Sequence, residues 1–383
     1  MKSDDVYPSC EIEAPAISPR HGPGATVALG LVPDPPPARG TVTVTGAPGW
    51  VTTGAAPPKD SAAARGDPAA ALAHSAHALG STLPGGSEAD LRAFDTMIGG
   101  ADVVGVGEAT HGSSEFCTVK HRLFRHLVER RGFRSLVLAV HRDAGVRLDA
   151  WVLHGTGHLR TIMDEEFRAG DSAWNTTETR DLLRWMRVWN VRRPDSPVRV
   201  AGNGLDCAFD IADEAARRYR DRVAADYTLW WQRHTGTRVF LSAHNAQIAG
   251  EGRAGTGTQG RILRERLGAR YVNAGFTFGQ GSFNAIDQNA PGAPWRRFTI
   301  GPPATRAGED VLERVSRRDW YLDTRAAAPG VAHDWIEAAH PIRSLGVVWP
   351  CDEYENTRLR ASYDILIHLH HIGATHRRAG NST

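Results

Sequence analysis

An acid and an imidazole stand three residues apart in the sequence GEATHG, residues 107–112. A carboxylate beside a histidine orients the ring and raises its basicity, so that the ring can take a proton from water. The N-terminus of a helix that begins just after the motif can stabilise developing negative charge. These residues therefore predict that His111 acts as a general base supported by Glu108. The alternative is that Glu108 caps the helix and His111 packs in the core.

A second histidine, His244, stands in SAHNAQ, residues 242–247, where another apolar segment ends. Two histidines at neighbouring strand ends can share one water molecule or one substrate carbonyl. A metal ion held by Glu108, His111 and His244 is chemically feasible, but their spacing matches no standard zinc signature. We therefore predict no metal and no other cofactor.

Two other kinds of chemistry have less support in the sequence. The chain contains no G-x-S-x-G motif, which favours activated water over a serine nucleophile. His368 and His370 place two imidazoles on one face of a predicted strand, but no further ligand is near them in sequence. We interpret them as a packed or solvated pair.

The elements that must position these residues alternate between strands and helices. Apolar segments predict short strands at 103–107, 135–140, 198–201 and 238–242, with a further strand at 362–372. Helices are predicted at 69–79, at 88–98, from Ser113 or Ser114 to Gly132, at 177–191 and at about 212–231. Strand 135–140 is apolar on both faces, which predicts an α/β fold with a mainly parallel central sheet flanked by helices. Ligands of such sheets bind outside the carboxyl ends of the strands, where both histidine motifs lie.

The first sixty residues differ in composition from the rest of the chain. They hold eleven of the 22 prolines and almost no apolar periodicity, and the strand-like stretch Thr41–Thr45 is isolated. We predict a flexible Pro/Gly-rich leader over residues 1–60 and one domain over residues 61–383.

Composition excludes several classes of protein. In this chain of 383 residues the net charge is +2 and acidic residues are interspersed among basic ones, which leaves no patch for nucleic acid. Apolar stretches are too short to span a membrane, and the acidic start of the chain does not match a signal peptide. Four widely spaced cysteines suggest neither a disulfide scaffold nor a zinc ribbon and indicate a cytoplasmic protein. Lys120 is the only lysine after residue 60, where every other basic residue is arginine.

Taken together, these segments resemble the erythromycin esterase family from about Ala69 to Ile372. The shared positions are the 107–112 motif, Glu115, Lys120, Trp174, Thr177-Glu178, residues 183–190, Gly204-Leu205-Asp206, His244-Asn245 and Tyr363-Asp364. The resemblance implies a metal-independent macrolactone esterase fold with His111 as general base, Glu108 as its support and His244 as the second active-site histidine. It also implies that Lys120 stands where the family usually has an arginine, so that its charge can stabilise an oxyanion. The residues expected to bind substrate are Lys120, Trp174, Glu178, Asn245 and Gln247.

Three positions depart from the family pattern. Ala139 stands where a family strand ends in a glutamate, and neither His141 nor Asp143 replaces it without a shift. Gln247 replaces the second histidine of the family's H-N-x-H, so an amide that cannot shuttle protons stands there. Asp206 and His244 are only 38 positions apart, which predicts a reduced helical lid.

These residues predict an esterase-like hydrolase that uses water activated by His111 and Glu108 on an ester or lactone. Loss of a carboxylate and an imidazole also suggests that the site is diverted to acyl transfer or cyclisation, on a biosynthetic intermediate in specialised metabolism. The partner is then a small molecule, in macrolide resistance or biosynthesis, rather than a nucleic acid or a membrane. The alternatives are a non-catalytic, haem-like ligand-binding member of the superfamily and a metal-dependent hydrolase.

Overall fold

The computed structural model describes residues 66–167, 173–204, 214–252 and 257–378. The leader predicted for residues 1–60 and the stretch Thr41–Thr45 lie outside this part of the chain. No helix in the described part is both long and apolar enough to cross a membrane.

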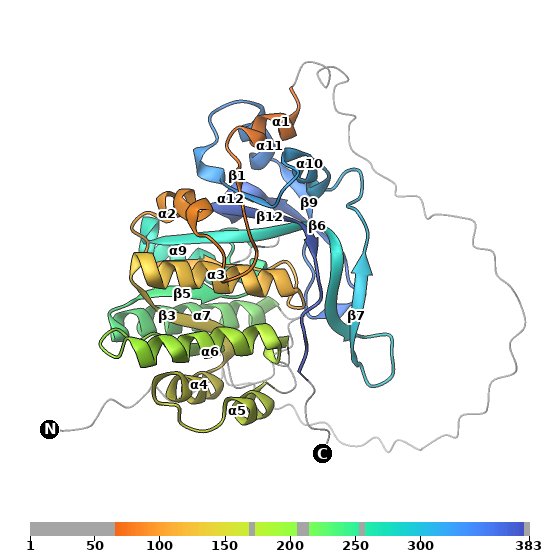
Figure 1. Cartoon of the computed structure of the whole chain (residues 1–383). Helices are drawn as coiled ribbons and strands as arrows, with labels where there is room; N and C mark the ends of the chain where they lie inside the picture. Colours follow the sequence, from red (N-terminus) through yellow and green to blue (C-terminus); the bar gives the residue numbers. More distant parts are fainter. Residues whose placement is uncertain (1–65, 168–172, 205–213, 253–256, 379–383) are drawn as a thin grey trace, which may run out of the picture. The chain divides into compact units, whose positions relative to one another are not determined.

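The described residues form a ten-stranded sheet with a parallel centre (Figure 1). Its strands are β1 (His77–Ala78), β2 (Val103–Val106), β3 (Phe133–His141), β4 (Arg199–Gly204), β5 (Arg238–Ser242), β6 (Tyr271–Asp287), β7 (Trp295–Ile300), β8 (Trp320–Asp323), β10 (Val348–Trp349) and β12 (Ile365–Ile372). The order is β1-β8-β12-β6-β2-β5-β3-β4, and the six strands from β12 to β4 are all parallel. β7 pairs antiparallel with the second half of the long strand β6, and β10 pairs parallel with its end. The predicted α/β fold with a mainly parallel sheet is therefore confirmed.

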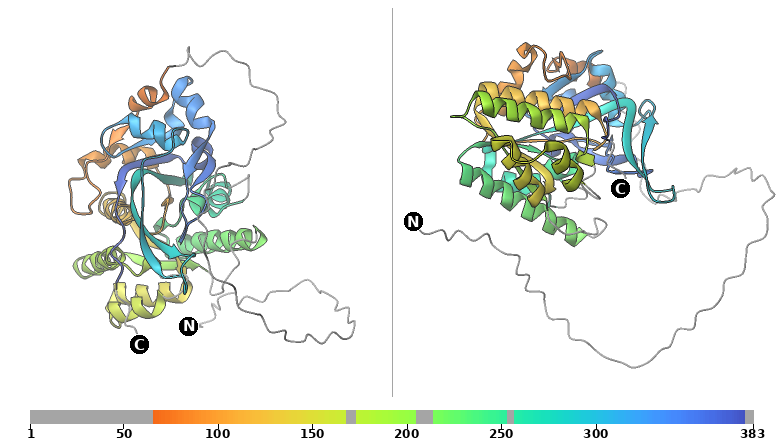
Figure 2. Two further views of the ribbon diagram at one scale, coloured as in Figure 1. Left: turned by 90° about the vertical axis from the view of Figure 1, so that its right-hand side faces the viewer. Right: turned by 60° about the horizontal axis from the view of Figure 1, so that its bottom comes forward.

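Two layers of helices cover the two faces of the sheet. One hydrophobic cluster joins α2 (Arg92–Ile98), α3 (Ser114–Arg131), α4 (Arg142–His154), α5 (Leu159–Glu166) and α6 (Thr177–Arg192) to the first face. A second cluster joins α1 (Pro68–Ala73), α7 (Glu214–Thr235), α8 (Asn245–Ile248), α9 (Gln259–Leu267), α10 (Gly308–Val315), α11 (Val331–Glu337) and α12 (Leu359–Ser362) to the other face. Figure 1 shows α3 and α6 in front of the sheet with α7 and α9 behind it, and the quarter turn of Figure 2 separates these groups to opposite sides.

Smaller elements complete the described part. Three short 3-10 helices lie at Ala89–Leu91, Gly268–Arg270 and Thr324–Ala326. Strands β9 (Ala339–Arg343) and β11 (Tyr354–Arg358) pair with each other in a separate two-stranded sheet. Between Asp206 and His244 the described residues contain a single helix, α7, in keeping with the predicted reduction of the helical cover.

Local signals account for the accuracy of the predicted boundaries. The side chain of Ser113 accepts a hydrogen bond from the backbone N–H of Phe116 at the start of α3, and Gly132 ends this helix in the left-handed conformation. The prediction for 69–79 was wrong in its second half, because α1 ends at Ala73 and β1 pairs there with β8. The predicted strand 362–372 begins only at Ile365, after the short helix α12.

Gly112 allows a close approach that the fold requires. A Cβ at this position would overlap the backbone of Asn284 on β6, while the carbonyl of Gly112 accepts hydrogen bonds from the N–H groups of Asn284 and Thr375. We expect Gly112→Ala to lower the free energy of unfolding by about 1–3 kcal/mol, because backbone must move to admit the methyl group. Urea denaturation measures this difference. Gly100→Ala is the matched control, since no atom lies within 4 Å of a Cβ there, and equal losses in the two variants would contradict the steric argument.

Candidate active site

The 107–112 motif lies directly after β2 and places Glu108 under the N-terminal half of α3. Glu108 is buried, and each of its oxygens has a partner: Oε1 lies 2.6 Å from His111 Nδ1, and Oε2 lies 2.6 Å from Lys120 Nζ. His111 is the more accessible of these residues, with 23% of its side chain exposed. The structure therefore unites a carboxylate, an imidazole and an ammonium group at the carboxyl end of β2.

Glu108 is ionised, and its charge fixes the tautomer of His111. Burial alone would raise the pKa of Glu108, but the positive charge of Lys120 and the hydrogen bond from His111 lower it to about 2. An ionised carboxylate only accepts hydrogen bonds, so Nδ1 of His111 must carry the proton that it shares with Glu108. The basic lone pair of the imidazole then belongs to Nε2, which has no hydrogen-bond partner among the described residues.

Lys120 reaches the site from the middle of α3. Its ammonium group donates to Glu108 Oε2 and, at 3.1 Å, to the carbonyl of Ala243 at the end of β5. Only 5% of the side chain is exposed. The ammonium group of Lys120 is thus buried against Glu108 and is not exposed to a ligand.

His244 lies beside His111, with 5.1 Å between the ring centroids. Its Nδ1 accepts a hydrogen bond from the N–H of Ala246 at the start of α8, which leaves Nε2 as the protonated nitrogen. Nε2–H donates to the carbonyl of Leu345, 3.0 Å away. Burial, followed by the effect of His111, lowers the pKa of His244 to about 4, so the ring is neutral at pH 7. The second histidine of the site is therefore an N–H donor rather than a base.

The lowered pKa of His244 makes stability depend on pH. The unfolded chain binds a proton at this residue below about 6.5, whereas the folded chain binds it only near 4. Between these values the unfolded state holds more protons, so the free energy of unfolding falls as pH drops from about 6.5 to about 4, by up to roughly 3 kcal/mol. We expect His244→Asn, which keeps a side-chain oxygen for the helix cap, to reduce this slope in urea denaturation from pH 7 to pH 4. Equal slopes in the variant and the wild type would contradict the assignment.

Asn245 and Gln247 hold the framework around His244. The amide of Asn245 donates to the carbonyl of Phe276 on β6 and accepts from its N–H, at 2.7 and 3.0 Å. Gln247 Oε1 accepts from the backbone N–H of His244, which completes a capping box. Both were expected to bind substrate; the structure places their side chains on backbone groups.

Glu178 and Trp174 lie around the start of α6. Glu178 accepts hydrogen bonds from Ser114 on α3 and from the backbone and ring of His376. Trp174 is half-buried and packs against the core of the first face. None of the hydrogen bonds or ring contacts found in the described part of the chain joins either side chain to Glu108, His111 or His244.

Two segments at the site were not anticipated from the sequence. Leu345 bridges the two histidine motifs, because its N–H donates to the carbonyl of Ala109 and its carbonyl accepts from His244. The segment Gly373–Arg378 crosses the starts of α3 and α6, and the N–H of Gly373 donates to Glu115 there. Neither segment carries a sequence signal, since Leu345 and Gly373 act through backbone groups of loops.

Two other groups near the site are unsuited to its chemistry. Ala139 packs against the second face of the sheet, so it supplies no second carboxylate, and Glu108 is the one carboxylate hydrogen-bonded to His111 among the described residues. Burial raises the pKa of the Cys117 thiol on α3, so this cysteine is not a thiolate nucleophile at neutral pH.

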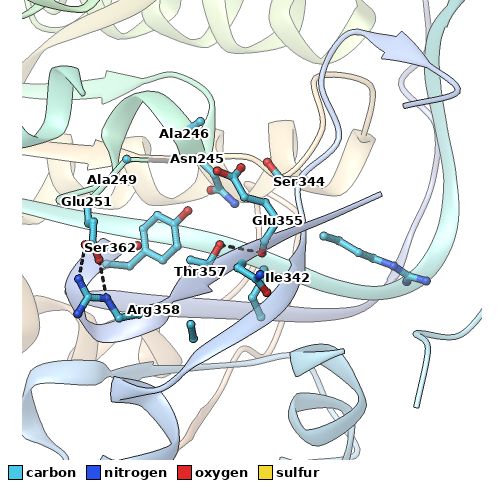
Figure 3. A pocket seen from close by; sticks show the side chains of 15 residues that line it. Asn245, Ala246, Ala249, Glu251, Ile342, Ser344, Glu355, Thr357, Arg358 and Ser362 are labelled. Atoms are coloured by element: carbon cyan, nitrogen blue, oxygen red, sulfur yellow. Dashed lines mark hydrogen bonds and ion pairs between the residues drawn. The ribbon is translucent and has the colours of Figure 1, made fainter. Parts of the chain in front are cut away.

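A cavity of about 300 Å³ adjoins the site on the side of α8 (Figure 3). Asn245 and Ser344, the sequence neighbours of His244 and Leu345, line it together with Glu355 of β11, whereas His111 does not. Figure 3 shows the paired side chains of Glu251 and Arg358 at its far end. His111 thus does not line this cavity.

The fold and the site define an α/β protein with a carboxylate–histidine pair at the carboxyl edge of a parallel sheet. The chain belongs to the erythromycin esterase family, whose model matches residues 128–213 and 208–372. This membership suggests a hydrolase-like function. The matched residues include His244 and begin after the 107–112 motif.

Solved structures share the fold at low sequence identity. A succinoglycan biosynthesis protein is 20% identical, with 83% of this chain and 100% of that chain covered and a TM-score of 0.73. A protein from Bacillus cereus is 20% identical, with 82% and 98% covered and a TM-score of 0.69. A mutant of the erythromycin esterase EreC in its open conformation is 14% identical, with 76% and 96% covered and a TM-score of 0.58.

Proposed function

We propose that this protein hydrolyses an ester or a lactone of a small molecule, with His111 as the general base for water. The observation that carries the proposal is the hydrogen bond between His111 Nδ1 and Glu108. It leaves Nε2, which no described residue contacts by a hydrogen bond, as a base on a partly exposed ring. Family membership supports the same class of reaction.

The reaction follows from the tautomers of the two histidines. Nε2 of His111 takes a proton from water, and the resulting hydroxide attacks the carbonyl carbon of the substrate. Glu108 stabilises the imidazolium that forms, and Lys120 keeps Glu108 ionised. The proton then passes from His111 to the leaving alkoxide, which yields a carboxylic acid and an alcohol.

We assign His244 the stabilisation of the tetrahedral oxyanion. Its Nε2–H donates to the carbonyl of Leu345, so this role requires the N–H to exchange that carbonyl for the substrate oxygen. A neutral ring serves this purpose, because it donates a hydrogen bond without exchanging its proton. In this proposal His111 transfers the proton, and His244 stabilises the negative charge on the substrate oxygen.

The proposal is tested by hydrolysis of a panel of aryl esters, alkyl esters and macrolactones in water enriched in oxygen-18. We expect the purified protein to cleave at least one member and to place one oxygen-18 atom in the acid product. The same panel with added alcohols or amines tests acyl transfer. Transfer to these acceptors without labelled acid would overturn the assignment of water as the nucleophile.

A further inference from the structure

Away from the candidate active site, three potential metal ligands meet on the second face of the sheet. His368 and His370 alternate along β12, and Glu313 approaches them from α10. One potential ligand atom from each of the three side chains lies within 4.8 Å of the others. The two histidines, which have no further ligand near them in sequence, thus lie beside the carboxylate of Glu313, 55 positions from His368 in the chain.

The geometry of the cluster suits a single metal ion. His368 Nε2 lies 2.9 Å from Glu313 Oε1, and His370 Nδ1 lies 2.8 Å from Glu313 Oε2. Two ligands at about 2.1 Å from one tetrahedral ion are separated by about 3.4 Å, roughly half an ångström more than these two distances. The carboxylate therefore faces both imidazoles at close to ligand spacing, and small side-chain movements would bring all three donors onto one ion.

The outer nitrogens of both rings are bonded as they are in metal sites. His368 Nδ1 lies 2.9 Å from the hydroxyl of Thr277, and His370 Nε2 lies 3.1 Å from the carbonyl of Arg318. Metal-bound histidines typically donate their other ring N–H to such an oxygen, which fixes the tautomer and directs the lone pair at the metal. Both lone pairs then face Glu313.

The surrounding backbone and charge also favour a cation. Glu313 lies so close to β6 that a Cβ on Gly279 would overlap its carboxylate, so a glycine makes room for the acid. A second carboxylate, Asp319, accepts a hydrogen bond from the backbone N–H of His370 at 2.9 Å. His368 is fully buried, whereas 20% of the His370 side chain and 29% of the Glu313 side chain are exposed, which leaves a path from solvent.

We propose that Glu313, His368 and His370 bind one divalent transition-metal ion, with Zn²⁺ the expected occupant. Two imidazoles and one carboxylate are a donor set that binds Zn²⁺ and leaves a coordination position for water. The ion would tie α10 to β12. The alternative is a metal-free network in which Glu313 only accepts hydrogen bonds from the two rings.

Metal binding is measured with Zn²⁺ alone on the full chain, after removal of metals with a chelator. We expect isothermal titration calorimetry to show one Zn²⁺ site per chain. The midpoint temperature of thermal unfolding should rise when Zn²⁺ is added. Glu313→Gln keeps a hydrogen-bonding oxygen but removes the charged ligand, and should weaken binding by roughly 100-fold or more. His370→Asn, at the exposed rim of the cluster, should act in the same direction.

His371→Ala is the matched control, because this exposed histidine is adjacent on the same strand and outside the cluster. Its affinity and thermal shift should equal those of the wild type. Equal Zn²⁺ affinity in the wild type, Glu313→Gln and His370→Asn, or no binding by the folded wild type, would overturn the proposal. Circular dichroism establishes that each variant is folded, and the readout does not depend on ester hydrolysis.

Discussion

Replacing His111 with alanine is expected to lower kcat for ester hydrolysis by about 10²- to 10⁴-fold, the usual contribution of a general base. The ring supplies the one basic Nε2 of the proposed site, and His244, with its pKa near 4 and both nitrogens hydrogen-bonded, cannot replace it. Lys120 still compensates the charge of Glu108 in this variant, so the protein should remain folded although Glu108 Oε1 loses its hydrogen bond from His111. Rates are measured on whichever substrate the panel identifies.

A double-mutant cycle makes this test specific. Glu108→Gln should also reduce kcat, because an amide neither stabilises the imidazolium nor fixes the tautomer. If Glu108 acts through His111, the double variant is no slower than His111→Ala alone. His371→Ala is the matched control and should keep wild-type activity. A kcat for His111→Ala within twofold of the wild type would contradict the role of His111.

Lys120→Met is expected to lower the free energy of unfolding by about 3–5 kcal/mol, because it leaves the buried charge of Glu108 without its cation. The pair lies at 2.6 Å, with only 5% and 4% of the two side chains exposed. The pKa of Glu108 should rise when the ammonium is lost, since burial then acts with less opposition. Urea denaturation at pH 7 measures the loss.

Neutralising both partners distinguishes an unpaired charge from a simple packing defect. The double variant Lys120→Met with Glu108→Gln buries no charge and should regain most of the stability that Lys120→Met loses. Lys120→Arg keeps the charge and should lose less than Lys120→Met. If the double variant is as unstable as Lys120→Met, Lys120 contributes by packing and not by compensating Glu108.

Local signals explain how much of the fold could be predicted. The limits of α3 follow from a capping serine and a terminal glycine, and β2, β3 and β5 follow from short apolar runs. No helix or strand was predicted within residues 245–361, although they include the long strand β6. β7 follows it directly, but its pairing with β10 and β12 depends on partners far away in the chain.

The sequence predicted which residues form the candidate site better than it predicted what each of them contacts. Glu108, His111 and His244 lie together because they follow the carboxyl ends of two neighbouring parallel strands, β2 and β5, as expected. The sequence could not show that Lys120 reaches down to Glu108, because that depends on the depth at which α3 packs. For the same reason Asn245 was expected at a ligand rather than on the backbone of β6.

The contacts of the segment Gly373–Arg378 determine when the candidate site can form during translation. Gly373 donates to Glu115 across 258 positions of sequence, and Thr375 donates to the carbonyl of Gly112 within the motif itself. The 107–112 motif leaves the ribosome early, whereas Gly373 and Thr375 emerge only after some 260 further residues. In a nascent chain the proposed general base therefore lies on a loop that lacks these hydrogen bonds. Activity should appear only once the segment Gly373–Arg378 has been made and has folded onto the motif, as expected for contacts of such long range.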